Sequence, residues 1–220
     1  GVSVAGAEKV GLTQVTIDDL SKGPPYQYTI KDLVPGTEYS VRVSAENVMG
    51  LNEPRESLPT SLAPPKQKPS EPLDVRLLVH SAASLKLLWM QPESDGGDTI
   101  TKYKIEWDTS PNFDSNRGSS LGSYHKVLTS PDTDCSVASC YHVINGLTKG
   151  VTYYARVNAY NSYGYSAVAA RPTPASESPK TQAEPPSQVL VNPFSSQSLL
   201  ALFGSPSDSG GGVVTKYKIE

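Results

Sequence analysis

The sequence lacks the features that membrane spans and nucleic-acid surfaces require. None of its apolar runs approaches the roughly 20 residues of a membrane-spanning helix. Its 19 basic and 22 acidic side chains leave a net charge of −3, and it has only two cysteines and three histidines. This charge balance gives no electrostatic reason to expect a nucleic-acid or anionic-membrane partner. We therefore expect no nucleic-acid partner and no membrane insertion within this segment.

Proline, glycine and tyrosine are plentiful, with 19, 17 and 12 residues respectively. The first two are typical of short strands joined by many turns. Apolar residues alternate with polar or smaller ones in segments 85–89, 103–107 and 153–159. This period of two is that of a strand that buries one face and leaves the other in water. Turn residues separate the segments and no long stretch has a helical period, so the sequence predicts an all-β sandwich or barrel.

A repeat with a spacing of 114 residues organises the chain. Segment 33–50 aligns without a gap with segment 147–164, and eight of these eighteen positions are identical. Segment 101–106 recurs letter for letter as 215–220, again 114 residues later. Because two unrelated parts of the unit give one spacing, the chain is predicted to consist of tandem modules.

Proline-rich linkers lie where this spacing places the module boundaries. Segments 62–72 and 177–186 each contain several prolines, which favour an extended, semi-stiff path. We predict the rear part of one module in residues 1–66, a complete module in 70–178 and the front part of a third in 184–220. The two partial modules are expected to expose apolar strand surface, since neither holds enough strands to close a core.

Three groups of residues resemble fibronectin type III modules. They are Trp89 near the end of the second strand, the Tyr103-x-Ile105-x-Trp107 strand, and the Leu-x-x-Gly-x-x-Tyr-x-x-Arg-Val-x-Ala-x-Asn-x-x-Gly run that begins at Leu33 and again at Leu147. The resemblance covers nearly the whole chain. It implies tandem immunoglobulin-like β-sandwiches, one complete and two partial, in which strands A, B and E face strands C, C′, F and G.

The resemblance also implies a core. Tyr153 and Tyr39 would be tyrosine corners, whose hydroxyls bond the backbone before strand F. Trp89 would fill the centre of the complete module, and Phe203 occupies the same position in the third. The remaining predicted core residues are Tyr103, Ile105, Trp107, Val157 and Val43. The repeat is longer than is usual for the family, and the excess between Asp108 and Cys140 predicts an enlarged C–C′ connection and a long approach to strand E.

No set of residues favours catalysis. Segment 118–122 matches the G-x-S-x-G pattern of hydrolases, but that chemistry needs a strand-to-helix turn and no helix is expected to follow. The three histidines are scattered, and the glycine pairs lack the partners of a phosphate loop. We expect a non-catalytic segment without a cofactor, although a β-sandwich can hold a site that the sequence does not reveal.

The two cysteines, Cys135 and Cys140, are close together in the sequence. A metal site usually takes four ligands in two pairs, and no second pair is present. A local disulfide that closes the turn before strand E is the favoured interpretation, and it would stabilise the fold by roughly 2 kcal/mol. Two free thiols in a reducing compartment are the alternative.

Two functions fit this organisation. The first is a protein-binding or spacer segment of an extracellular adhesion or receptor-like protein, in which the loop with Asn161, Tyr163 and Tyr165 contacts another protein. Oxidised cysteines would favour it, whereas the lack of any N-x-S/T sequon counts against it. The second is a structural array of a giant cytoplasmic, titin-like cytoskeletal protein, whose modules segment 95–106 resembles. In both, the partners are other proteins and the neighbouring modules.

Two lysines, Lys102 and Lys104, are predicted on the outer face of strand C and recur as Lys216 and Lys218. A solvated face is the simplest interpretation of this pair, and contact with an acidic partner is the alternative.

Overall fold

The computed structural model describes residues 23–128, 135–136 and 139–220, and strands are the only regular secondary structure in this part of the chain. The chain divides into two compact units, Gly1–Leu33 and Val34–Glu220, and the strands of the described residues lie in the second. Within the described ranges no helix is long and apolar enough to cross a membrane. The predicted all-β fold is confirmed.

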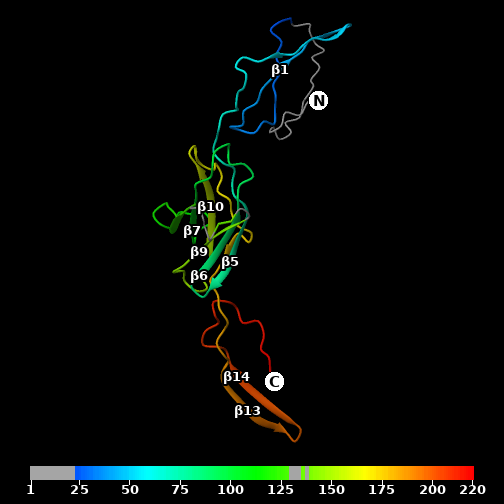
Figure 1. The fold of residues 1–220 in the computed structure, drawn as a ribbon. Helices are drawn as coiled ribbons and strands as arrows, with labels where there is room; N and C mark the ends of the chain where they lie inside the picture. Colours follow the sequence, from blue (N-terminus) through cyan, green and yellow to red (C-terminus); the bar gives the residue numbers. More distant parts are fainter. Residues whose placement is uncertain (1–22, 129–134, 137–138) are drawn as a thin grey trace. The chain divides into compact units, whose positions relative to one another are not determined.

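The complete module contains two antiparallel sheets, whose strands are coloured from teal to yellow in Figure 1. One sheet has the strand order β5-β6-β9. The other has the order β11-β10-β7-β8, and β12 also pairs with β10. The strands are β5 (Leu73–Ser81), β6 (Ser84–Met90), β7 (Lys102–Asp108), β8 (Gly122–Val127), β9 (Cys140–Ile144), β10 (Tyr153–Asn161), β11 (Gly164–Tyr165) and β12 (Ser176–Glu177). This is the predicted arrangement of A, B and E against C, C′, F and G.

The core of this module forms because the strands alternate. In β10 every second side chain from Tyr153 to Asn161 is buried, as the sequence pattern predicts. Trp89 and Tyr103 come from opposite sheets and meet edge to face, with ring centroids 5.3 Å apart. Burial raises the pKa of Tyr103 to about 12, so its hydroxyl stays neutral at physiological pH. Ile105 and Val157 are also fully buried.

Trp107 lies at the edge of this core and is half-buried. It is paired with Gly122 of the neighbouring strand β8. A Cβ atom at position 122 would lie only 2.3 Å from the indole ring, so the ring packs directly on the glycine backbone. Trp107 therefore belongs to the core as predicted, but at its margin and not at its centre.

The tyrosine corners are present in both modules that carry the motif. The backbone N–H of Thr148 donates to the hydroxyl of Tyr153 at 3.0 Å. The N–H of Val34 donates to the hydroxyl of Tyr39 at 2.8 Å, and both donors lie five residues before their tyrosine. Each bond fixes the turn that leads into strand F and satisfies the polar end of a partly or fully buried ring.

The partial modules differ from the complete one in burial. In the first, the described residues form short ladders of β1 (Arg42–Val43) with β4 (Arg55–Glu56) and of β2 (Glu46–Asn47) with β3 (Gly50–Leu51). In the third, β13 (Ser187–Ser195) pairs only with β14 (Ser198–Gly204), the orange hairpin of Figure 1.

This difference overturns two of the predicted core positions. Val43 is 71% exposed and Phe203 is 37% exposed, so neither is a core residue here. The prediction was wrong because burial of a strand's apolar face needs a second sheet, and no second sheet covers either residue in the described part of the chain. Tyr39 is half-buried, and Phe203 contacts Tyr217 with ring centroids 5.0 Å apart. Strands on both sides of residues 70–178 expose apolar side chains, with Leu51 60% and Leu199 72% exposed.

Removing the tyrosine-corner hydroxyl should destabilise the complete module. We expect Tyr153→Phe to lower its free energy of unfolding by about 1–3 kcal/mol, because the Thr148 N–H loses its partner. Urea unfolding followed by tryptophan fluorescence measures this, since both tryptophans of the chain lie in that module. Tyr39→Phe makes the same change in the first module and is the control. Equal urea midpoints for Tyr153→Phe and the unmodified chain would contradict the assignment.

Candidate functional site

The outer face of the larger sheet carries charged and polar side chains of β7 and β10. Strands β7 and β10 pair so that Arg156 lies opposite Glu106 and Tyr160 lies opposite Lys102. Successive side chains of a strand point to opposite faces, so these four residues lie on the face away from the core. The same alternation sends Tyr103 inward.

A three-residue ion cluster stands at one end of this face. Glu106 accepts from Arg156 Nε through Oε2 and from Lys104 Nζ through Oε1, both at 2.9 Å. The hydroxyl of Ser120 also donates to Glu106 Oε1 at 3.3 Å. Burial by itself would raise the pKa of Glu106, but the hydrogen bonds and charges of Arg156 and Lys104 outweigh it and hold this pKa below its ordinary value of 4.5.

The connection between β7 and β8 covers this cluster. Its Phe113 is buried, and the guanidinium of Arg156 lies 4.2 Å from the centre of the Phe113 ring. Arg171 approaches the same ring at 5.4 Å and donates to the carbonyl of Pro111 at 3.1 Å. The predicted enlarged C–C′ connection is therefore confirmed, and it folds back onto the sheet as an ordered cover.

Asp108 holds this connection together from its first turn. Its carboxylate is fully buried and accepts backbone N–H groups of Ser110 at 3.0 Å, Ser115 at 3.2 Å and Leu121 at 3.3 Å. Burial would raise the pKa of Asp108, but the hydrogen bonds from Ser115 and Ser110 outweigh it and lower this pKa. The carboxylate thus fixes both ends of the loop. The G-x-S-x-G pattern lies in this loop, and strand β8 follows it in place of the helix that hydrolases need.

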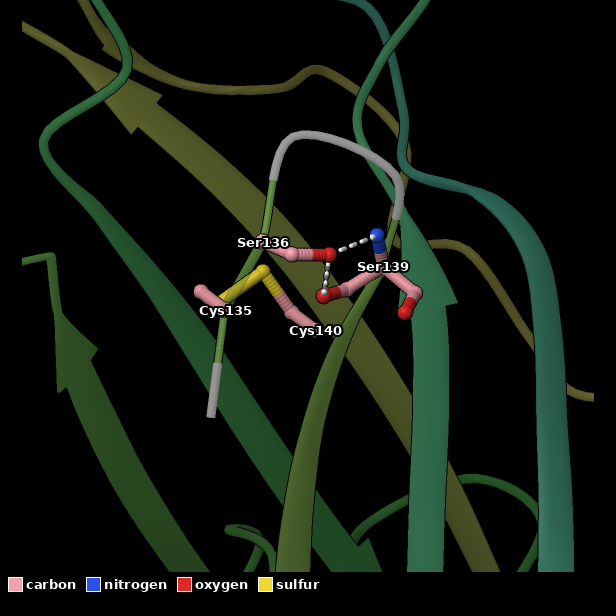
Figure 2. The surroundings of a disulfide bond; sticks show 4 residues. All are labelled: Cys135, Ser136, Ser139 and Cys140. Atoms are coloured by element: carbon pink, nitrogen blue, oxygen red, sulfur yellow. Dashed lines mark hydrogen bonds between the residues drawn. A yellow bond between two sulfur atoms is a disulfide. The ribbon is translucent and has the colours of Figure 1, made fainter. Parts of the chain in front are cut away.

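The two cysteines form a disulfide bond, shown in Figure 2. Cys140 is buried as the first residue of β9 and pairs with Trp89 across the sheet. The backbone N–H and the carbonyl of the intervening residues also bond, with Ser136 N donating to Ser139 O at 2.9 Å. The structure therefore contains the local disulfide that was the favoured interpretation of the two cysteines. Among the described residues no group of histidine, cysteine, aspartate and glutamate could hold a metal ion.

Asn161 was predicted to contact a partner, and the structure corrects this. Its side chain is fully buried, so it is not accessible to another protein. The amide Nδ2 donates to the carbonyls of Gln67 at 2.7 Å and Asp95 at 2.8 Å, while Oδ1 accepts the N–H of Tyr163 at 2.9 Å. One side chain thus joins the segment before β5, the loop before β7 and the turn after β10. Asn161 therefore has a structural role. The alternation along β10 could have indicated this, because Asn161 falls on the buried face of the strand.

The two tyrosines predicted beside Asn161 lie differently. Tyr163 is 50% exposed in the turn between β10 and β11, where a partner can reach it. Tyr165 is half-buried on the outer face, and its ring centroid lies 4.7 Å from that of Tyr160. Lys102 Nζ lies 4.1 Å from the centre of the Tyr160 ring. Sequence reasoning missed Tyr160, although its outward position opposite Lys102 follows from the alternation of β7 and β10.

These elements match a known family. The family model of the fibronectin type III domain matches residues 4–61 and 70–175, more than half of the chain. The chain belongs to the fibronectin type III family. Both matched regions fall within the modules predicted from the 114-residue repeat.

Several relatives of this fibronectin type III chain are known. Neogenin of Rattus norvegicus is 27% identical over 212 residues, which are 96% of this chain and 14% of neogenin. Protein sidekick-1 of Gallus gallus is 30% identical over 200 residues, which are 88% of this chain and 8% of sidekick-1. The chain therefore spans a small part of the length of these relatives. The crystal structure of domains d3–d4 of the rat CD45 extracellular region covers 81% of this chain with 14% identity and a TM-score of 0.51, which supports the fold.

The buried amide of Asn161 should stabilise the complete module. We expect Asn161→Ala to lower the free energy of unfolding by about 2–3 kcal/mol, because the carbonyls of Gln67 and Asp95 lose their donor. Asn47 occupies the equivalent position in the first module, where it is exposed and accepts only the N–H of Met49. Asn47→Ala is therefore the matched control, and tryptophan fluorescence in urea should distinguish the two. Equal destabilisation by both substitutions would count against this role of Asn161.

The lowered pKa values of Glu106 and Asp108 predict loss of stability in acid. A carboxyl whose pKa is lower in the folded than in the unfolded chain binds protons more readily when unfolded, so acid favours unfolding. The free energy of unfolding should fall as the pH drops from the ordinary glutamate value of 4.5 through the lowered values. Glu106→Gln should make this fall shallower, as measured by urea unfolding across pH 3 to pH 7.

The remaining acid dependence in Glu106→Gln is assigned to the other carboxyls of the module whose pKa is lowered, Asp98, Asp108 and Glu177. Glu93 is an exposed carboxylate of the same module, so Glu93→Gln controls for the loss of one negative charge. A pH profile for Glu106→Gln that coincides with that of the unmodified chain would refute the ionic role of Glu106.

Proposed function

We propose that this fibronectin type III chain is a non-catalytic spacer and protein-binding segment of a longer extracellular, adhesion or receptor-like protein. The observation that carries the proposal is the disulfide between Cys135 and Cys140. Such bonds persist in oxidising environments, outside the cell and in the secretory pathway, and are rare in the cytosol. The similarity to neogenin over nearly the whole chain supports a place in a long protein.

The non-catalytic part of the proposal is supported by the carboxylates of the complete module, which are bound by groups of the protein itself. Glu106 is bound by Arg156 and Lys104, and Asp108 is bound by backbone N–H groups of its own loop. Catalytic acids and bases need a free position toward a substrate, whereas these carboxylates have their acceptor oxygens directed at the protein itself. Their lowered pKa values also oppose proton transfer near neutral pH.

The spacer role is supported by the module architecture. The complete module closes its own core, and its strands and linkers recur at a fixed spacing along the chain. Modules in series hold their outer faces and loops at defined intervals, and side chains such as Tyr163 are then available for protein contacts. The cytoplasmic array remains the competing function, and the state of the cysteines separates the two.

The proposal predicts that the cysteines are oxidised in the protein taken from its natural source. Unfolding it in N-ethylmaleimide without reductant should add no maleimide to Cys135 or Cys140, and prior reduction should add two, as read by mass spectrometry of the intact protein. The reagent must be present from the moment of lysis, so that no thiol is oxidised during isolation. Two maleimides without prior reduction would overturn the extracellular assignment in favour of the cytoplasmic array.

A further inference from the structure

Four side chains from four different strands gather on the outer face of the larger sheet. They are Lys102 of β7, His125 of β8, Tyr160 of β10 and Tyr165 of β11, and together they are called the tyrosine patch. Lys102 Nζ lies 4.1 Å from the centre of the Tyr160 ring and 5.7 Å from that of Tyr165. The ring of His125 stacks on Tyr165 with centroids 6.3 Å apart. The patch is thus a cation bordered by aromatic rings.

The charge of Lys102 is not neutralised by a carboxylate in the described part of the chain. Its neighbour Lys104 forms an ion pair with Glu106 at 2.9 Å, whereas Lys102 contacts only aromatic rings among the interactions of this face. Lys102, Tyr160 and Tyr165 are half-buried and His125 is exposed, so all four are reachable from solvent. Outward-facing charges of the described β7 and β10 residues here are Lys102, Lys104 and Arg156 against Glu106 and the buried Asp108. At the end of the sheet that holds the tyrosine patch, Asp98 accepts the N–H of Ser162 and pairs with Lys66 at 3.5 Å. Lys102 adds a cation there that has no carboxylate partner among the described residues.

A second cation–π pair in the same module offers a comparison. On the outer face of the other sheet, Lys86 Nζ of β6 lies 4.0 Å from the ring of Tyr141 of β9. There a lysine covers one ring of an adjacent strand, as cross-strand pairs do. In the tyrosine patch Lys102 lies near two rings, those of Tyr160 and Tyr165, and the ring of His125 stacks on Tyr165. Tyr163, which is 50% exposed, follows in the adjacent turn.

We propose that the tyrosine patch is a docking surface for an acidic segment of a partner protein, with a carboxylate on Lys102 and an aromatic or apolar side chain against Tyr160 and Tyr165. Tyrosine is enriched in protein interfaces because it offers a large apolar ring with a polar end. An uncompensated positive charge beside such rings complements a negative partner and disfavours a basic one. The inference rests on the proposed function, since it names the surface through which the module binds proteins.

The test uses the whole chain and a defined probe, a fluorescein-labelled peptide of alternating glutamate and tyrosine. Fluorescence anisotropy should show binding that weakens as salt rises, because the contact includes an ion pair. Lys102→Glu should weaken binding by about tenfold or more, since like charges then face each other. Lys86→Glu makes the same charge change on the other sheet, beside the ring of Tyr141, and should bind like the unmodified chain.

Two further variants guard against indirect effects. Lys102→Gln removes the charge and keeps a polar side chain with part of the aliphatic stem, and it should also weaken binding while leaving the urea midpoint of tryptophan fluorescence unchanged. Lys216→Glu alters the equivalent lysine of the third module and should have no effect on binding. A peptide of alternating lysine and tyrosine should not bind.

The outcomes separate this inference from the proposed function. No binding of the acidic peptide, or equal losses for Lys102→Glu and Lys86→Glu, would overturn the assignment of the tyrosine patch. Neither result concerns the oxidation state of the cysteines, by which the proposed function stands or falls. If the cysteines are free thiols but binding of the acidic peptide depends on Lys102, the tyrosine patch stands as a docking surface and the extracellular assignment is wrong.

Discussion

The packing of Trp89 against Tyr103 between two sheets is the contact on which the rest of the complete module depends. Each ring comes from a different sheet, so their contact requires that both sheets are present and in register. The buried aliphatic residues Leu85, Leu87, Ile105 and Val157 surround this pair because the strands alternate. The third module shows the converse. Phe203 has the position of Trp89 in the repeat but stays 37% exposed on a lone hairpin.

Buried polar residues around this core hold the loops and strand ends of the module in place. Asn161 ties three segments together at one end of the sandwich, and Asp108 organises the connection between β7 and β8 at the other end of strand β7. Glu106 and Arg156 lie on the outer face, yet they are covered because Phe113 and Ser120 of that connection fold over them. Most buried polar groups in proteins are bonded, and each of these carboxylates and amides has its partners. Trp89 Nε1 and the hydroxyl of Tyr103 are the exceptions among the described residues, since both are buried without a hydrogen-bond partner.

What remains open to other molecules is therefore restricted to a few places. The covered end of the outer face is occupied by the module's own ion cluster, whereas the opposite end presents Lys102 among aromatic rings. The difference arises from where the C–C′ connection lies, since it covers Glu106 and stops short of the tyrosine patch. We propose that such a module, which closes its own core and leaves Lys102 accessible among aromatic rings, binds other proteins within a series of modules. The disulfide places that series outside the cytosol in our proposal.

The sequence by itself determined the strands, the module spacing and the centre of the core. These depend on local alternation and on short motifs that recur 114 residues apart, and Trp89, Ile105 and the tyrosine corner of Tyr153 follow from them directly. The pairing of Cys135 with Cys140 was also accessible, because the chain offers no other cysteine. Only the tertiary structure decided that Asn161 is inaccessible, that Val43 and Phe203 are exposed, and that Lys102 meets Tyr160 and Tyr165. The physical reason is that alternation fixes which face a side chain points to, whereas burial and contact depend on which distant segment packs over that face.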